Sequence, residues 1–372
     1  MSEPIKDRLV SLDVFRGITI AGMILVNNPG DWGAIYSPLQ HAPWNGLTPT
    51  DLIFPFFLFI VGIAIPLALD KLKSDTRLVY TKILRRSALI FLLGLFLNAF
   101  PLFDFSSLRI PGVLQRIAVC YLITSLIYIN SGWKTQSVIA IGLLFIYWIL
   151  MTSVPVPGCD IASISDKACN LSAYLDRSIL GVNHIWSLGK VYDPEGILST
   201  IPAVATTMSG ALSGVWIKSG RKKMELVAGM LVFGLLLLAI GWAHSFAVPI
   251  NKSLWTSSYV IYTTGCALCF LGVMMWIIDL KGYRGWSKPF VVFGMNALAL
   301  YIGAEMLARL FDVIKFADGK GGEISLKSTI YETVFLPMFS PLNASLLYAI
   351  TFIFGWLLVL WFLYSRKIFI KV

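Results

Sequence analysis

The stretch His41-Ala-Pro-Trp-Asn-Gly-Leu-Thr-Pro-Thr-Asp-Leu-Ile-Phe-Pro-Phe-Phe-Leu-Phe-Ile-Val-Gly62 joins a polar turn to an apolar run. The apolar part continues beyond Gly62 and is long enough for a helix that crosses a bilayer, which takes about 20 residues. The turn brings together His41, Trp44, Asn45 and Asp51, in a chain that has 3 histidines. This stretch therefore predicts a polar site at one end of a membrane helix.

The composition of the 372-residue chain is that of a membrane protein. Hydrophobic residues make up 57%, charged residues 13%, and the mean hydropathy is +0.77. Soluble domains carry roughly 25% charged residues, about twice as many. The net charge of +10 comes from basic residues in short loops and not from a basic and aromatic surface, so we expect no nucleic-acid partner. We expect no cleavable signal peptide, because the first apolar run contains Asp13 and Arg16.

Ten apolar runs predict an all-α bundle of about ten transmembrane helices, because lipid favours helices that satisfy their own backbone hydrogen bonds. The runs are 9–28, 52–69, 83–100, 113–130, 136–154, 195–217, 224–243, 257–279, 288–311 and 344–364. No composition shift marks a second domain, so residues 1–372 are expected to form one transmembrane domain. A homodimer is compatible with this prediction but has no sequence signal of its own.

Lys and Arg gather in alternate loops, which predicts the orientation of the bundle. These loops hold Lys71, Lys73, Arg77, Lys82, Arg85, Arg86, Lys134, Lys218, Arg221, Lys222, Lys223, Lys281, Arg284, Lys288, Arg366, Lys367 and Lys371. The long loop 28–51 has none. Cytoplasmic loops are enriched in basic residues, so both termini are expected in the cytoplasm and His41 on the opposite side.

Polar residues inside the first run suggest a functional stripe. Asp13 and Arg16 are three positions apart and can pair on one helix face, and Asn27 lies three turns beyond Arg16. Charges inside a membrane span usually face a bundle interior or an aqueous cavity. The pair either locks helix packing or begins a polar path from the cytoplasmic face towards His41.

Two further segments bring charge to the outer side. Gln115 and Arg116 open the fourth run, where an Arg can bind a carboxylate or phosphate in a bidentate manner, or pair structurally with Glu305 or Asp312. Asp193 is predicted to be the N-cap of the sixth helix, with Pro194 at its first position and Glu195 in its first turn. Glu195 is favoured there by the helix dipole and could also hold a cationic amine.

The residue types around His41 suit acyl transfer. A histidine near its ordinary pKa of about 6.5 can take a proton from a nucleophile or accept an acyl group itself. Asn27 or Asn45 can donate a hydrogen bond to an oxyanion. Trp44 can stack on a sugar ring or serve as an ordinary interfacial tryptophan. Cys159 and Cys169 share an outer loop and can pair if that side is oxidising.

Several stretches resemble the heparan-α-glucosaminide N-acetyltransferase family and its bacterial relatives. In order along the chain, they are Arg8-Leu-Val-Ser-Leu-Asp-Val-Phe-Arg-Gly17, Val26-Asn27, His41-Ala-Pro-Trp-Asn-Gly-Leu-Thr48, Asp51-Leu-Ile-Phe-Pro55, Arg109-Ile-Pro-Gly-Val-Leu-Gln-Arg116, Asp193-Pro-Glu-Gly-Ile-Leu-Ser-Thr200, Asn251-Lys-Ser-Leu-Trp-Thr-Ser-Ser-Tyr-Val260 and Gly294-Met-Asn-Ala-Leu298. The lysosomal enzyme's additional amino-terminal luminal region and one further span have no counterpart among these matches.

The resemblance implies an enzyme that transfers acetyl across a membrane, from cytoplasmic acetyl-CoA to the amine of a terminal glucosamine. We expect no metal. It implies that His41 and Asn27 are the active-site residues. In this interpretation Trp44, Asn45, Asp51 and Glu195 bind the sugar, and Arg16, Gln115 and Arg116 bind acetyl-CoA. Transfer through an acetyl-histidine and direct transfer both remain open.

We therefore expect an acetyl-CoA-dependent amino-sugar N-acetyltransferase of a bacterial inner membrane. The first alternative is a transporter or permease for amino sugars, which would use the same polar groups within the bundle. The second is an acyltransferase that acts on another glycan of the cell envelope or on a hydroxyl group.

Overall fold

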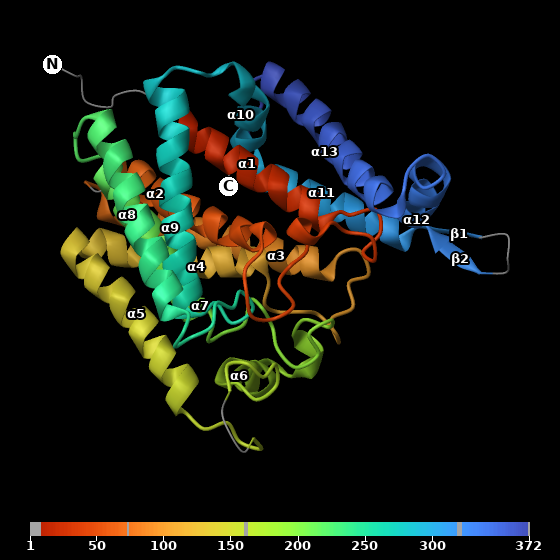
Figure 1. Ribbon diagram of the computed structural model, residues 1–372, viewed down its shortest axis with the longest axis horizontal. Helices are drawn as coiled ribbons and strands as arrows, with labels where there is room; N and C mark the ends of the chain where they lie inside the picture. Colours follow the sequence, from red (N-terminus) through yellow and green to blue (C-terminus); the bar gives the residue numbers. More distant parts are fainter. Residues whose placement is uncertain (1–8, 73, 160–162, 318–321, 371–372) are drawn as a thin grey trace.

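Long helices and short connecting turns make up most of the computed structural model, which describes residues 9–72, 74–159, 163–317 and 322–370. The α-helices are α1 (Val10–Asn27), α2 (Ile53–Leu69), α3 (Thr76–Ala99), α4 (Val113–Asn130), α5 (Trp133–Ser153), α6 (Leu171–Leu180), α7 (Thr200–Ile217), α8 (Lys223–His244), α9 (Ser257–Met274), α10 (Lys288–Met295), α11 (Ala297–Val313), α12 (Leu326–Ile330) and α13 (Pro341–Ser365). Short 3-10 segments are η1 (Ser37–Leu39), η2 (Pro49–Leu52), η3 (Asp70–Leu72), η4 (Val182–His184) and η6 (Gly285–Ser287), and π-helical turns are η5 (Met275–Leu280) and η7 (Tyr331–Phe335). One antiparallel hairpin, β1 (Lys315–Ala317) with β2 (Glu323–Ser325), extends from the bundle (Figure 1).

The helices confirm the prediction of a polytopic all-α protein. Within the described residues, 7 helices are long and apolar enough to cross a membrane: α1, α2, α4, α5, α8, α9 with η5, and α13. The bent pair of α10 and α11 raises this number to 8 if it forms one span. α3 and α7 match two other predicted runs in position but are not among these candidate spans.

Glycines allow the central helices to pack in direct backbone contact. A Cβ built on Gly62 of α2 would overlap the carbonyl oxygen of Thr207 and lie 2.9 Å from the nitrogen of Ala211, both on α7. A Cβ on Gly17 of α1 would likewise overlap the backbone of Phe290 on α10. Small residues permit this close approach, which is the usual way in which membrane helices gain packing energy.

The predicted span 288–311 is not one straight helix. α10 and α11 meet at an angle of 73° on either side of Asn296. The buried Asn296 side chain donates to the carbonyl of Ile368 at 3.1 Å and accepts from the amide of Ile370 at 2.8 Å. This carboxamide both donates to and accepts from the C-terminal segment. These bonds stabilise a non-helical conformation at the break between α10 and α11.

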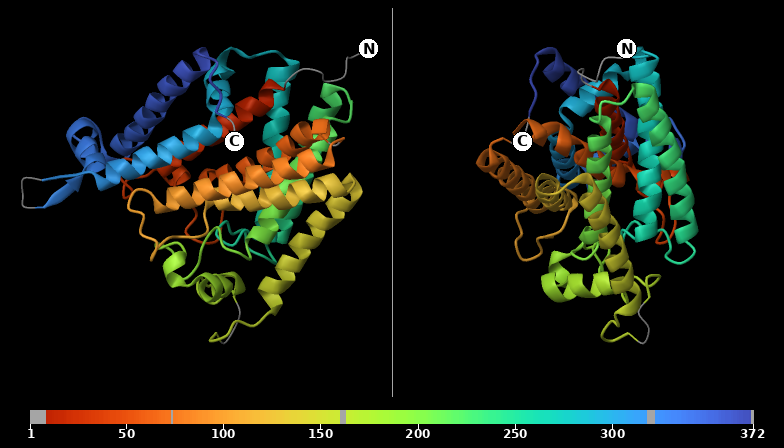
Figure 2. Two further views of the ribbon diagram at one scale, coloured as in Figure 1. Left: turned by 180° about the vertical axis from the view of Figure 1, so that it is seen from behind. Right: turned by 90° about the vertical axis from the view of Figure 1, so that its left-hand side faces the viewer.

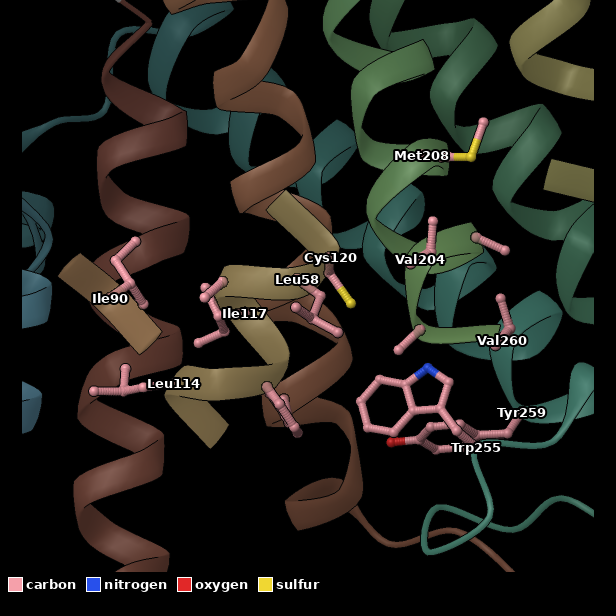
Figure 3. Packing of buried hydrophobic residues seen from close by; sticks show 14 of the residues in the cluster. Leu58, Ile90, Leu114, Ile117, Cys120, Val204, Met208, Trp255, Tyr259 and Val260 are labelled. Carbon is pink, nitrogen blue, oxygen red and sulfur yellow. The ribbon is translucent and has the colours of Figure 1, made fainter. Parts of the chain in front are cut away.

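A buried apolar cluster lies between α2, α3, α4, α7 and α9 and supports the candidate site. Figure 3 shows the rings of Trp255 and Tyr259 against this cluster, with centroids 5.2 Å apart. The Trp255 indole donates to Thr206 Oγ1 at 3.0 Å, and the Tyr259 hydroxyl donates to the carbonyl oxygen of Asp51 at 2.6 Å. The cluster thus fixes the backbone at Asp51.

The loops that carry the predicted site residues gather at one end of the bundle. Figures 1 and 2 show α6 and the loops after α1, α5 and α8 at the same end, away from α10. Hydrogen bonds join these loops directly, because the amide of Gly46 donates to Ile250 at 2.8 Å. We call this end of the molecule the loop end.

Candidate active site

His41 and Asp51 form a hydrogen-bonded dyad at the loop end. His41 Nδ1 lies 2.7 Å from Asp51 Oδ1, and the His41 side chain is 51% exposed while that of Asp51 is 1% exposed. The second carboxylate oxygen of Asp51 accepts from the amides of Ala42 and Thr48 and from the Thr48 hydroxyl, at 3.0 to 3.1 Å. A fixed buried carboxylate thus orients an exposed imidazole, and a histidine held in this way can serve as a base.

The sequence around Asp51 explains why this carboxylate is so firmly held. Thr48 and Asp51 form a capping box at the start of η2, and Pro49 occupies the first position of that segment. With both oxygens engaged and the residue fully buried, Asp51 contacts the imidazole and does not face the solvent. The structure therefore places Asp51 behind His41, and its role in sugar binding stays a prediction.

Lys252 is the third member of the site. Its Nζ lies 3.0 Å from His41 Nδ1, 3.2 Å from His41 Nε2 and 3.6 Å from Asp51 Oδ1. Burial lowers the pKa of Lys252, whereas the charges of Asp51 and Glu195 act in the opposite direction. Lys252 lies in the family-like segment 251–260, but the sequence does not single it out, because a lysine in a loop carries no signal of its own.

Asn251 holds Lys252 in this position. The buried Asn251 side chain donates to Asn45 Oδ1 at 3.1 Å and accepts from the amide of Leu254 at 2.9 Å. The Asn251 amide donates to the hydroxyl of Thr256 at 3.0 Å. The turn before α9 is therefore rigid, and it presents Lys252 to the dyad.

Glu195 lies in a buried ion-pair cluster and not in a helix. Arg109 Nη2 lies 2.6 Å from Asp193 Oδ1 and 2.5 Å from Glu195 Oε2, and Arg109 Nε donates to Asp193 Oδ2 at 2.9 Å. Burial alone would lower the pKa of Arg109, but the bonds to Asp193 and the charge of Glu195 raise it above its usual value.

The prediction that Asp193 caps the sixth helix is wrong. Helix α7 begins at Thr200, with Ser199 as its N-cap. The Asp193 carboxylate pairs with Arg109. It also accepts from the backbone amides of Trp186 and Glu195, both at 2.9 Å. These partners occupy both oxygens of Asp193, so its carboxylate does not cap α7. The chain forms turns before α7 begins at Thr200.

Asn27 is the last residue of α1 and faces α11. Its Nδ2 donates to Glu305 Oε1 at 3.3 Å. The sequence allowed Glu305 to pair with Arg116. In the structure Glu305 contacts Asn27 instead. The amide of Asn27 is thereby oriented by a carboxylate, as an oxyanion donor would need to be.

Gln115 and Arg116 are buried inside the bundle. Arg116 is 1% exposed, donates to the carbonyl of Gly196 at 3.1 Å and to the Ser199 hydroxyl, and lies 5.2 Å from the Trp255 ring centroid. Its hydrogen bonds therefore tie α4 to the start of α7 and involve neither Glu305 nor Asp312. With 4% exposure, Gln115 is equally enclosed, and the role of both residues in acetyl-CoA binding stays a prediction.

Arg16 lines a cavity between α1 and α2. Its Nη1 lies 3.3 Å from Asp13 Oδ1 and donates to the carbonyl of Gly294 at 3.3 Å, which confirms the predicted pairing with Asp13. The cavity has a volume of about 230 Å³, and Arg16 is the charged side chain in an otherwise apolar lining that includes Leu12 and Ile63. Arg16 lies 11 residues before Asn27, roughly 16 Å along α1.

Trp44 and Asn45 connect the His41 turn to the loop end. The Trp44 indole donates to the carbonyl of Ile164 at 3.1 Å and packs edge-on against Tyr192, with centroids 5.0 Å apart. Asn45 Nδ2 donates to Ser165 Oγ at 3.4 Å. Asn45 is exposed and Trp44 half-buried beside His41, so both remain candidates for sugar contact.

Comparison with known proteins identifies the family of the chain. The family model for the catalytic region of heparan-α-glucosaminide N-acetyltransferase matches residues 8–223, which is more than half of the chain and includes His41, Asn27 and Asp51. The chain belongs to this family.

Two curated relatives match almost the whole chain of this family member. Heparan-α-glucosaminide N-acetyltransferase of Homo sapiens is 29% identical over 427 residues, with 98% of this chain and 60% of the relative covered. The Mus musculus protein of the same name is 28% identical over 424 residues, with 98% and 61% covered. The chain thus spans about three fifths of the length of these relatives. Within its described residues, no group of three or more His, Cys, Asp or Glu side chains is placed to hold a metal ion.

Proposed function

We propose that this protein is an acetyl-CoA-dependent N-acetyltransferase that acetylates the amine of a glucosamine-type sugar. The observation that carries the proposal is the exposed His41 imidazole, held by the buried Asp51 carboxylate 2.7 Å away, within the part of the chain matched by the catalytic family model. The names of the two relatives support the reaction and the sugar.

The proposed topology is a single domain of ten spans in a bacterial inner membrane, with both termini in the cytoplasm and His41 outside. The distribution of basic residues supports it. So does the disulfide between Cys159 and Cys169, because disulfides persist in oxidising compartments and this one lies at the loop end, as His41 does. The sequence had left this pairing open.

In the proposed reaction, His41 acts as the base. Its Nε2 takes a proton from the acceptor amine, and the amine nitrogen attacks the carbonyl carbon of the thioester. The bond from that carbon to sulfur then breaks, and the proton held by His41 passes to the sulfur, so that coenzyme A leaves as the thiol. Asp51 stabilises the transient imidazolium. In the alternative route His41 Nε2 first accepts the acetyl group and then passes it to the amine.

The positive charge of Lys252 beside the dyad suits the negative charge that develops on the thioester oxygen during the attack. Lys252 already lies beside His41 Nε2, and the Asn27 amide is oriented by Glu305. We propose that Asn27 and Lys252 stabilise the oxyanion, because fixed donors in a partly buried site act strongly on developing charge. Glu195, with 10% of its side chain exposed, would accept a hydrogen bond from the neutral acceptor amine, and Trp44 and Asn45 would contact the sugar.

The cavity at Arg16 is the proposed entry for the donor. A volume of about 230 Å³ lies below the range of sites that enclose a whole drug-sized ligand, so the cavity suits a narrow pantetheine arm and not a nucleotide. Arg16 would bind a polar group of that arm. Gln115 and Arg116 would act indirectly, by holding the start of α7 behind the site.

The test is acetylation of glucosamine by purified protein supplied with labelled acetyl-CoA. We expect His41→Ala to abolish the activity of a folded protein, whereas His244→Gln, which keeps a hydrogen-bonding group towards Ser257, retains it. Full activity of His41→Ala would refute the site assignment. Uptake of glucosamine into proteoliposomes without acetyl-CoA would favour a permease, and preferred acetylation of a hydroxyl acceptor would favour the other glycan chemistry.

The two chemical routes differ in their kinetics. Direct transfer requires donor and acceptor together, so double-reciprocal plots at several acceptor concentrations would intersect. The acetyl-histidine route predicts parallel lines and label on the protein when the acceptor is absent.

A further inference from the structure

The Cys159–Cys169 disulfide holds one end of the segment 163–169, which is well bonded internally. The two Cα atoms are 5.8 Å apart. The amide of Ser163 donates to the carbonyl of Cys169 at 3.0 Å. The carboxylate of Asp166 accepts from the amides of Ala168 at 2.7 Å and Cys169 at 2.8 Å. The part of the loop from Ser163 to Cys169 is therefore a defined structural unit, which we call the disulfide loop.

One side of the disulfide loop is anchored to α6. Asn170, the next residue, caps this helix by accepting from the amide of Ala173 at 2.9 Å. Arg177, one turn before the end of α6, donates to the carbonyl of Ala168 at 2.9 Å. The disulfide loop therefore has a fixed base on the scaffold.

The other side of the disulfide loop contacts the turn that carries His41. Ile164 accepts from the Trp44 indole at 3.1 Å, and Ser165 Oγ accepts from Asn45 Nδ2 at 3.4 Å. Lys167 Nζ lies 5.7 Å from the centroid of the Trp44 ring. Three residues of the disulfide loop thus hold the two side chains proposed to contact the acceptor.

A continuous set of contacts leads from the disulfide loop to the dyad. Asn45 contacts Ser165 on one side and accepts from Asn251 Nδ2 at 3.1 Å on the other. Lys252 follows Asn251 in the chain and lies 3.0 Å from His41 Nδ1. Displacement of the disulfide loop would therefore reach the acceptor side of the site. The cavity at Arg16 is on other helices and has no part in these contacts.

We propose that the disulfide loop is a positioning element for the acceptor, and that its covalent closure sets how tightly the acceptor binds. The inference rests on the proposed function. An intact disulfide restricts the conformations open to the loop, so Ile164 and Ser165 stay in place to orient Trp44 and Asn45. Reduction converts the disulfide to two thiols at the expense of an added dithiol and releases this restraint.

The experiment compares the purified protein with the double variant Cys159→Ser/Cys169→Ser in the glucosamine assay. We expect the KM for glucosamine to rise about tenfold in the double variant, as the loss of about one hydrogen bond would give, and the KM for acetyl-CoA to change less than about twofold. Dithiothreitol should have the same effect on the wild type and none on the double variant. The matched control is Cys266→Ser/Cys269→Ser, which alters two free cysteines of α9 and should change neither constant.

A second measurement is independent of activity. Hydrogen exchange of the amide of Gly46, which donates to Ile250 at 2.8 Å, should become about tenfold faster on reduction of the wild type. Unchanged exchange, or an unchanged glucosamine KM in the folded double variant, would overturn the proposal. If the wild type acetylates no acceptor, the proposed function fails, and faster exchange would still support the positioning of the His41 turn by the disulfide loop.

Discussion

Replacing Asp51 by asparagine keeps the size of the side chain and changes the proton arrangement of the dyad. Asp51 Oδ2 accepts from Ala42, from the Thr48 amide and from the Thr48 hydroxyl, while Oδ1 lies 2.7 Å from His41 Nδ1. In Asp51→Asn the amide oxygen must take the position with three donors, so the NH₂ group faces Nδ1. His41 then accepts at Nδ1 and carries its proton on Nε2, where the base is needed.

The expected loss follows from this wrong tautomer. General-base catalysis contributes roughly 10²- to 10⁴-fold, and a misplaced proton removes most of it. We expect kcat of Asp51→Asn to fall by about 10³-fold, measured with labelled acetyl-CoA at saturating glucosamine. Thermal unfolding in the same detergent controls for folding, and Thr50→Ser is the neighbouring control. A folded Asp51→Asn protein that retains kcat within threefold of the wild type would refute the role given to the dyad.

Two further predictions concern packing and pH. Gly62→Ala should destabilise the protein by about 1–3 kcal/mol, because the new Cβ overlaps the backbone of α7. The control Gly142→Ala should have little effect, since a Cβ there meets nothing within 4 Å. Equal unfolding temperatures of the two variants would contradict the packing described for α2. Burial raises the pKa of the Asp176 carboxyl to about 6 from 3.8. The folded state then binds more protons than the unfolded state between these values, so the free energy of unfolding should fall by up to about 3 kcal/mol as pH rises through this window. Denaturant titrations at pH 4 and 6 should show about 2 kcal/mol of this fall in the wild type and lose it in Asp176→Asn. The same fall in the variant would contradict the prediction.

Helix positions could be predicted from the sequence because apolar length is a local property. The run 113–130 coincides with α4, and 257–279 with α9 and η5, because each depends on its own residues. The break at Asn296 could not be predicted in this way, since the carboxamide binds Ile370, which lies 74 positions further along the chain. Asp193 failed as a cap for the same reason, because its partner Arg109 is 84 positions away.

The sequence predicted part of the candidate site, as it predicted part of the fold. His41 stood out because its turn is dense in polar residues, and the structure places it at an exposed end beside Asp51. The buried position of Asp51 depends on Thr48, which the sequence does suggest through the capping box. Lys252 was missed because only the folded chain brings the turn before α9 against His41.

The central claim is that His41 serves an acceptor on the side of the membrane opposite the donor. The most direct measurement uses proteoliposomes of known protein orientation, with labelled acetyl-CoA on the side of the basic loops and glucosamine on the other. We expect N-acetylglucosamine on the glucosamine side with wild-type protein, and none with His41→Ala. Product that forms only when both substrates are on the side of the basic loops, or undiminished product with His41→Ala, would contradict it.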